Sequence, residues 1–233
     1  MILKEWNEKL QNLRKIIMQP DKIDDIKRMC LELHEMVHTS KMSGTQSPTF
    51  EDELWKNLDE QTARSAINEK GRTVLYGLWH SARIEDITMN ILVAGQNQVF
   101  EEGNWQKRIK SPIKNTGNGL TGQEIFEFSQ KIDISELQEY RMAVGRKTRE
   151  IISSLKGTDL KKKMSKDSLQ RIIDEEAVEN IESANWLIDF WGKKNMAGIL
   201  LMPVTRHHIV HINESLRAIK RSRKQPSTII VQP

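Results

Sequence analysis

Residues 72–95 read RTVLYGLWHSARIEDITMNILVAG, and this stretch decides the fold. Small or apolar side chains and one histidine recur in it every three or four positions, which is the period of one face of an α-helix. These residues are Gly77, His80, Ile84, Ile87 and Ile91. Gly95 is suited to a helix C-terminus because glycine adopts the left-handed conformation readily. The pattern predicts one long helix.

Similar periods predict helices over residues 3–18, 21–38, 135–155, 168–191 and 203–223, and shorter ones up to residue 58 and over 158–164. We expect a break in 168–191 near Glu175 or Glu182. Asp21 is expected to cap the second helix, and Thr121 with Glu124 to form a capping box. Glycine (12), proline (6) and aromatic residues (6%) are sparse, so the fold class is all-α. We expect a single domain over residues 1–225 and a flexible tail over 226–233.

Composition narrows the classes of function. The net charge is +4, and much of the excess lies in a C-terminal basic run that lacks aromatic residues, so nucleic-acid binding is not expected. The sequence contains no 18-residue apolar stretch, which predicts no membrane span. The N-terminus does not have the pattern of a signal peptide. Cys30 is the only cysteine and lies on an apolar helix stripe, so we expect a buried, inert thiol and a cytoplasmic protein.

All six histidines fall in three short stretches. They are His34 with His38, His80 alone, and His207 with His208 and His211. The pairs at i, i+4 stack on one helix face, where two imidazoles can bind one metal ion and a third can join from another helix. His208 points about 100° away from His207, which predicts a position on the surface or behind the ligands.

Residues 34–38, HEMVH, match H-E-x-x-H, a zinc-peptidase signature in which the glutamate activates water. The motif is short, ends in a loop, and lacks an upstream sheet edge that could hold a peptide. We therefore expect a solvated Glu35 and histidines that line the helical core.

The Trp79-His80 pair, followed by H-H-x-x-H at 207–211, resembles the DinB/YfiT-like superfamily of metal-dependent enzymes over roughly residues 20–221. The resemblance implies an up-down-down-up four-helix bundle, here with extra short helices, that is often dimeric and holds a divalent ion, commonly zinc or nickel. Carried onto this chain, the ligands are His80, His207 and His211. Some members are thiol S-transferases or isomerases, so the resemblance implies a small-molecule substrate such as a low-molecular-weight thiol, and a homodimer. The His34/His38 pair and the 96–135 segment depart from the family pattern.

Three neutral imidazoles leave an ion its full charge and open positions, so it can lower the pKa of a bound water or thiol. Thiol transfer and metal-assisted hydrolysis are both coherent with such a site. The alternative is a non-catalytic helical protein with a structural or vestigial metal site. Glu35, Arg83 and Glu85 are candidate acid–base or anion-binding groups, and surface salt bridges explain them equally well.

Overall fold

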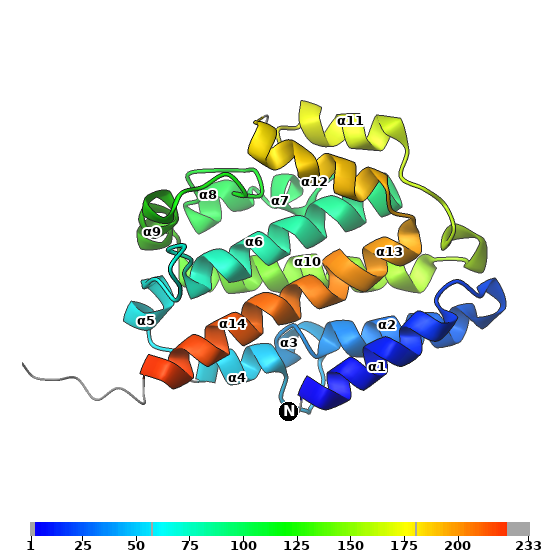
Figure 1. Ribbon diagram of the computed structural model, residues 1–233, viewed down its shortest axis with the longest axis horizontal. Coiled ribbons are helices and arrows are strands. Elements are labelled where there is room, and N and C mark those ends of the chain that lie inside the picture. The colour runs from blue at the N-terminus through cyan, green and yellow to red at the C-terminus, as the bar shows by residue number, and fades with distance from the viewer. Residues whose placement is uncertain (1–2, 57, 180, 223–233) are drawn as a thin grey trace, which may run out of the picture.

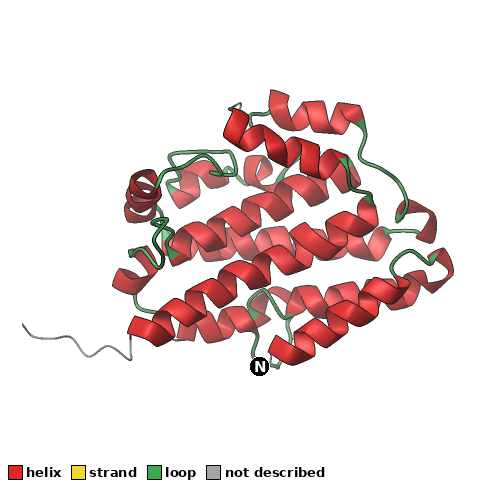
Figure 2. Cartoon of the chain, viewed as in Figure 1, coloured by secondary structure: helices red, strands yellow, loops and turns green. Residues whose placement is uncertain are grey.

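The computed structural model describes residues 3–56, 58–179 and 181–222, and the expected tail at 226–233 lies outside them. All the regular elements in this part of the chain are helices, and no strand is present (Figure 2). Two isolated backbone bridges, Ala66 with Thr73 and Lys163 with Asn195, fasten loops without forming a sheet. The all-α prediction is therefore confirmed.

Long helices carry the architecture. They are α1 (Leu3–Ile16), α2 (Ile23–Glu35), α6 (Val74–Asp86) with its π-helical continuation η2 (Ile87–Ala94), α10 (Ile134–Ser154), α12 (Glu182–Gly192) and α14 (His207–Ser222). In Figure 1, α2, α6, α10 and α14 lie side by side, with their axes close to the long axis of the view. Helix α6 packs against both α10 and α14, and α10 also packs against α2.

Shorter elements connect and cover the long ones. They are η1 (Pro20–Lys22), α3 (Ser40–Ser43), α4 (Phe50–Lys56), α5 (Glu60–Arg64), α7 (Val99–Glu102), α8 (Trp105–Ile109), α9 (Gly122–Lys131), η3 (Gly157–Asp159), α11 (Lys166–Asp174), α13 (Met196–Leu201) and η4 (Met202–Arg206). Helices α11 and α12 pack on each other, and α11 contacts η2 (Figure 1). The 96–135 segment, which departs from the family pattern, contains the short helices α7, α8 and α9.

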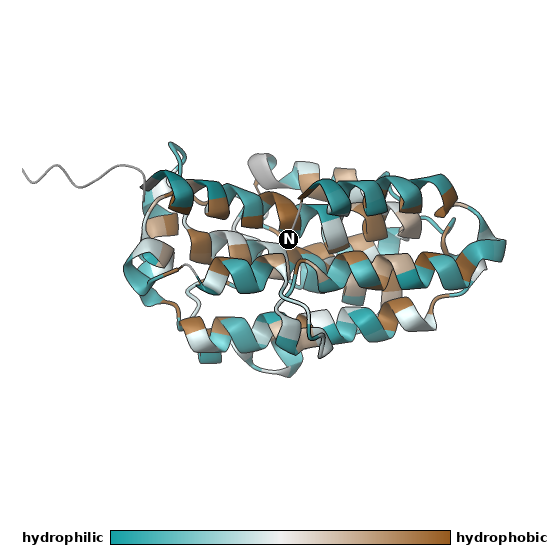
Figure 3. Cartoon of the chain, turned by 90° about the horizontal axis from the view of Figure 1, so that it is seen from below, coloured by the Kyte–Doolittle hydropathy of each residue, from teal (hydrophilic) through white to brown (hydrophobic). Residues whose placement is uncertain are grey.

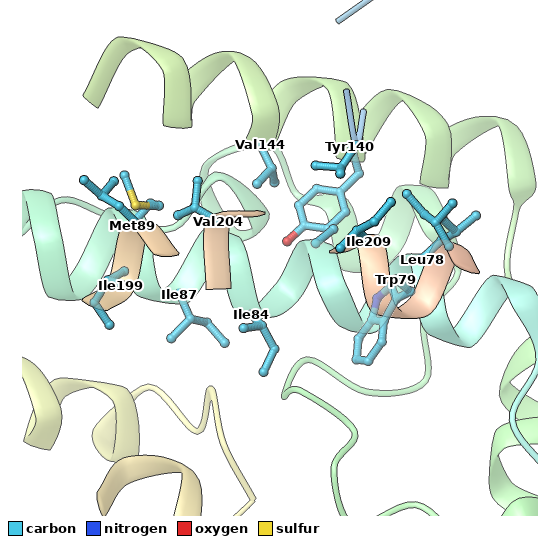
Figure 4. Packing of buried hydrophobic residues seen from close by; sticks show 14 of the residues in the cluster. Leu78, Trp79, Ile84, Ile87, Met89, Tyr140, Val144, Ile199, Val204 and Ile209 are labelled. Atoms are coloured by element: carbon cyan, nitrogen blue, oxygen red, sulfur yellow. The ribbon is translucent and has the colours of Figure 1, made fainter. Parts of the chain in front are cut away.

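Helix α6 is the central element, because all thirteen of its residues are buried. Thr73 begins it: its side-chain oxygen accepts a hydrogen bond from the Tyr76 amide at 3.0 Å. Apolar side chains of α6 pack against others from α10, α13 and α14 (Figure 4). Full burial of an aliphatic side chain contributes about 1.5–3 kcal/mol. A helix surrounded by others also places its polar residues in the interior, and this positions the sites described below.

Several boundaries differ from the sequence prediction. Asp21 does not cap α2, because Pro20 starts a separate 3₁₀ turn and α2 begins only at Ile23. The helix expected at 158–164 is reduced to a 3₁₀ turn at Gly157–Asp159. The predicted break in 168–191 is confirmed: Glu176 has a φ of 52°, which an α-helix cannot continue.

Other local predictions are confirmed. Gly95 adopts a φ of 65° and ends the long central helix. Thr121 and Glu124 form the expected capping box at the start of α9. Cys30 is fully buried, and burial raises the pKa of its thiol to about 12.

The apolar faces of the helices meet in one continuous cluster of buried side chains that extends from Trp6 to Ile219. Apolar residues turn toward neighbouring helices, and hydrophilic residues dominate the outward faces (Figure 3). Among the described helices, none is both long and apolar enough to cross a membrane.

Candidate metal centre

His80, His207 and His211 come together where α6 packs against α14. Each offers a ring nitrogen, and these three atoms lie within 4.8 Å of one another. Their ring centroids are 4.8–5.3 Å apart. His80 and His211 are each 6% exposed, and His207 is partly exposed. We call these three residues the open cluster, since one of them, His207, is partly exposed.

Helix geometry explains the convergence. His207 and His211 are one turn apart on α14 and share a face. Gly77 lies opposite on α6, where a Cβ atom would be 3.5 Å from the Cβ atom of His211. That distance is ordinary van der Waals contact, so the packing of α6 on α14 would also admit a methyl group at Gly77. The same packing brings His80, one turn further along α6, to the pair.

Hydrogen bonds to neighbouring groups orient the rings. His80 Nδ1 donates to the carbonyl oxygen of Thr116 at 2.7 Å, which leaves Nε2 with a free lone pair. Carboxylate or carbonyl partners of this kind are usual for metal-binding histidines. The Glu214 carboxylate lies 3.7 Å from His211 Nδ1 and accepts a hydrogen bond from Asn68. His207 Nδ1 is buried without a hydrogen-bond partner.

Burial keeps two of the three rings, His80 and His207, uncharged. Burial, with a smaller contribution from His211, lowers the pKa of His80 to about 3. The same causes lower the pKa of His207 well below its usual value. A histidine must be neutral to bind a metal ion, so these two rings are in the ligand form at neutral pH.

The donor set fits a divalent ion of the zinc or nickel class, for which imidazole is a suitable ligand. A tetrahedral ion with bonds of about 2.0–2.1 Å separates its ligand atoms by about 3.4 Å. The Nε2 atoms of His207 and His211 are 3.2 Å apart, close to that spacing. Without an ion, this contact is a hydrogen bond between the two rings, which a bound ion would replace.

A groove of about 1080 Å³ runs beside the open cluster. None of the three histidines lines it, but Glu214 does, which connects the groove to His211. Its walls also carry the cationic side chains of Lys70, Arg72 and Arg221. The groove is of the size that small-molecule sites have, roughly 300–1,000 Å³.

The other three histidines form a second cluster around Glu85, which we call the buried cluster. His34 Nε2 donates to Glu85 Oε1 at 2.7 Å, and His38 Nε2 donates to Glu85 Oε2 at 3.0 Å. His208 Nε2 lies 2.9 Å from Glu85 Oε2, without the alignment of a hydrogen bond. All four side chains are at most 1% exposed.

The buried cluster corrects two sequence interpretations. His208 does point away from His207, as expected. Its ring lies in the core and not at the surface, because α14 has neighbouring helices on the side of His207 and also on the side of His208. Glu85 and Arg83 form no surface salt bridges, since both are fully buried. Arg83 instead pairs with Asp86 at 3.2 Å and donates to the Tyr140 hydroxyl at 3.1 Å.

Burial also controls ionisation in this cluster. It lowers the pKa of His38 to about 4 and that of His208 to about 3, although Glu85 acts in the opposite direction. Burial alone would raise the pKa of Glu85, but the adjacent His38, His34 and His208 lower it well below its usual value. Glu85 is therefore an ionised carboxylate among three imidazoles.

In the structure, Glu35 of the H-E-x-x-H motif is separated from the two histidines of the motif. Helix α2 ends at Glu35, and a tight turn places His38 over His34, with ring centroids 4.3 Å apart. Glu35 is partly exposed and lines a shallow surface groove together with Glu32 and Met36. The glutamate that would activate water therefore faces away from the two histidines, as expected for an incidental motif.

No protein-family model matches this chain, and no curated protein sequence matches it. The functional argument therefore depends on the geometry of the two clusters and of the groove.

Proposed function

We propose that the chain is a metal-dependent enzyme that acts on a small polar molecule at the open cluster. The observation that carries the proposal is the convergence of His80, His207 and His211, with the His80 lone pair directed by the Thr116 carbonyl. Zinc or nickel is the expected ion, because neutral imidazoles suit both. When bound, the ion supplies Lewis acidity and lowers the pKa of a coordinated water or thiol.

Residues around the open cluster determine how a substrate approaches it and is held. His207 is the partly exposed ligand, so an incoming molecule reaches the cluster from its side. Lys70, Arg72 and Arg221 in the adjacent groove can hold a carboxylate of the substrate. A small thiol that carries carboxylates fits this arrangement, and thiol S-transfer is the reaction we favour, with hydrolysis as the alternative outcome.

The proposal includes membership of the DinB/YfiT-like superfamily and its up-down-down-up four-helix bundle. The side-by-side packing of α2, α6, α10 and α14 supports this arrangement (Figure 1). The homodimer that is common in that superfamily is part of the same proposal. Sedimentation of the purified full chain tests it directly.

The test of function compares metal content with turnover. The full chain is loaded with Zn²⁺ or Ni²⁺ and assayed with small thiols, including glutathione, against an aromatic halide, and separately with esters and amides. We expect thiol-dependent turnover that is lost on chelation and restored by the ion. His211→Ala should reduce affinity for the ion of the open cluster at least ~100-fold, since even outer partners of ligands contribute 10–100-fold.

Val210→Ala is the matched control, because Val210 is the adjacent residue on α14 and is 48% exposed. It should keep both ion and turnover. An ion that binds at the open cluster without any turnover across these substrates would favour the non-catalytic alternative. Retention of that ion by His211→Ala would contradict the site itself.

A further inference from the structure

We propose that His34, His38, Glu85 and His208 form a second metal site, closed to solvent, that takes Zn²⁺. This site is separate from the open cluster and does not depend on the proposed function. Its ligands come from α2 and the turn after it, from α6, and from α14. An ion there would join three helices that meet in the core.

Unsatisfied polar atoms are the first observation behind the proposal. Both ring nitrogens of His208 are buried without a hydrogen-bond partner, and so is His34 Nδ1. A buried polar atom left unpaired costs about 1–3 kcal/mol. His208 Nε2 nevertheless lies 2.9 Å from a carboxylate oxygen without hydrogen-bond alignment. A shared ion satisfies this nitrogen where the hydrogen bond does not.

The surroundings of the buried Glu85 carboxyl group are the second observation. The other fully buried carboxylates each face an arginine: Glu51 pairs with Arg141 at 2.6 Å, and Asp86 with Arg83 at 3.2 Å. In the part of the chain that the structure describes, no lysine or arginine forms an ion pair with Glu85. Buried charges are normally paired or bound to metals, and only imidazoles surround this one. A divalent cation would neutralise it.

The geometry places the donors where an ion needs them. One ring nitrogen each from His34 and His38 and one oxygen of Glu85 lie within 4.8 Å of one another. His208 adjoins this group, with its ring centroid 4.8 Å from that of His38. His34, His38 and Glu85 supply three ligand atoms, and His208, whose Nε2 lies 2.9 Å from Glu85 Oε2, is the residue that would move in to complete the four-coordinate shell typical of structural zinc.

Burial also determines what the site does. Because its four side chains are at most 1% exposed, no position remains for water or substrate. Glu35 faces the other way and cannot serve as a base there. We infer a structural ion that fixes α2 and α14 against α6, rather than a peptidase centre.

The test uses the double variant His80→Ala/His211→Ala, which removes the open cluster and leaves the buried one intact. The full-length protein is incubated with Zn²⁺, dialysed and analysed for metal by mass spectrometry. We expect about two ions per wild-type chain and about one per double-variant chain. X-ray absorption of the double variant should show nitrogen and oxygen neighbours only, with three imidazoles, at about 2.0–2.1 Å.

Adding Glu85→Gln to the double variant should remove the remaining ion, while adding Glu35→Gln should not, because Glu35 lies outside the cluster. Circular dichroism at 222 nm establishes that each variant is folded. A double variant without zinc overturns the second site, even if the Glu85 variant does not fold. A wild type and double variant that each hold one ion would instead support the second site and contradict the open one.

Discussion

His207 and His208 are adjacent on α14, yet their rings belong to different clusters: His207 lies 5.0 Å from His80 by ring centroids, and His208 lies 4.8 Å from His38. Consecutive residues of an α-helix point about 100° apart. One helix therefore serves both clusters at once, and a single-residue change can affect one without removing a ligand of the other.

This relationship predicts that the two ions can be removed separately. His211→Ala should lose the ion of the open cluster and keep the buried one, and His208→Ala should do the reverse. Because the buried ligands are at most 1% exposed, we expect the ion left in His211→Ala to transfer to a chelator much more slowly. A colorimetric chelator followed over time measures this, and equal release rates in both variants would contradict the assignment.

The second prediction concerns the stability of the metal-free protein at low pH. The folded-state pKa values of His80, His208 and His38 are about 3, 3 and 4, below the 6.5 of an unfolded chain. Between these values the unfolded state binds more protons, so the free energy of unfolding falls as the pH falls from about 6.5 to about 4. Glu85 acts in the same direction at the acid end, since its folded pKa is also depressed.

Urea denaturation in the presence of a chelator, at several pH values, tests this slope. His80→Phe lacks one of the four imidazoles whose pKa is lowered and should lose less stability across the same interval. An unfolding free energy that does not change between pH 6.5 and 4 would contradict the burial of these neutral rings.

The third prediction concerns the buried ion pair of Arg141 with Glu51. Two guanidinium nitrogens contact the carboxylate at 2.8 and 2.6 Å, and both side chains are 1% exposed. Arg141→Met leaves an uncompensated buried charge, which costs about 3–5 kcal/mol of unfolding free energy. Arg28→Met, which breaks exposed pairs with Asp25 and Glu32, should cost much less, because solvent screens exposed ion pairs. Similar losses in the two variants would show that the buried pair is solvated.

The fourth prediction is that Glu35 takes no part in metal binding or catalysis. Glu35→Gln should leave metal content and turnover unchanged, because Glu35 lines a surface groove away from both clusters. A peptidase would instead lose hydrolysis and keep its zinc. Peptide cleavage by the wild type that disappears in Glu35→Gln would therefore reverse our interpretation of H-E-x-x-H.

The fifth prediction is that Cys30 does not react in the folded protein. Its side chain is 0% exposed, and burial raises its thiol pKa to about 12, so little thiolate forms at pH 8. A disulfide reagent should modify it only after denaturation. Ser153→Cys, at an exposed position near the end of α10, should add one thiol that reacts at once. Rapid modification of the native wild type would contradict this.

Helical periodicity predicted most of the fold, because α1, α10 and α14 each bury one face. It also placed His80, His207 and His211 for a shared site, since i, i+4 spacing fixes the relation within a helix. The same reasoning failed for α6, where periodicity assigns charged residues to a solvent face. Other helices surround α6 on all sides. This arrangement depends on tertiary packing, which the local sequence pattern does not predict.

The buried cluster was therefore missed as a unit. One signal was available in the sequence: Arg83, Glu85 and Asp86 are the only Asp, Glu, Lys or Arg residues in the mostly apolar run from 74 to 94. Charges within such a run indicate buried partners more than solvent. The sequence could not predict that the Thr116 carbonyl orients His80, because any residue type in a loop can supply a backbone acceptor.

The π-helical turn η4, at Met202–Arg206, lies directly before His207, and its Thr205 hydroxyl donates to the Leu200 carbonyl of α13 at 3.2 Å. A π-turn carries one more residue than an α-turn. The extra residue is accommodated within the turn, so deletion of one residue there, with closure to α-geometry, would leave His207 and His211 facing α6. Deletion of a residue between His207 and His211, where α14 is regular, would instead rotate the rest of the helix by about 100° and take His211 out of the open cluster. The π-turn is therefore a segment in which a lineage with this fold could change length and keep the site.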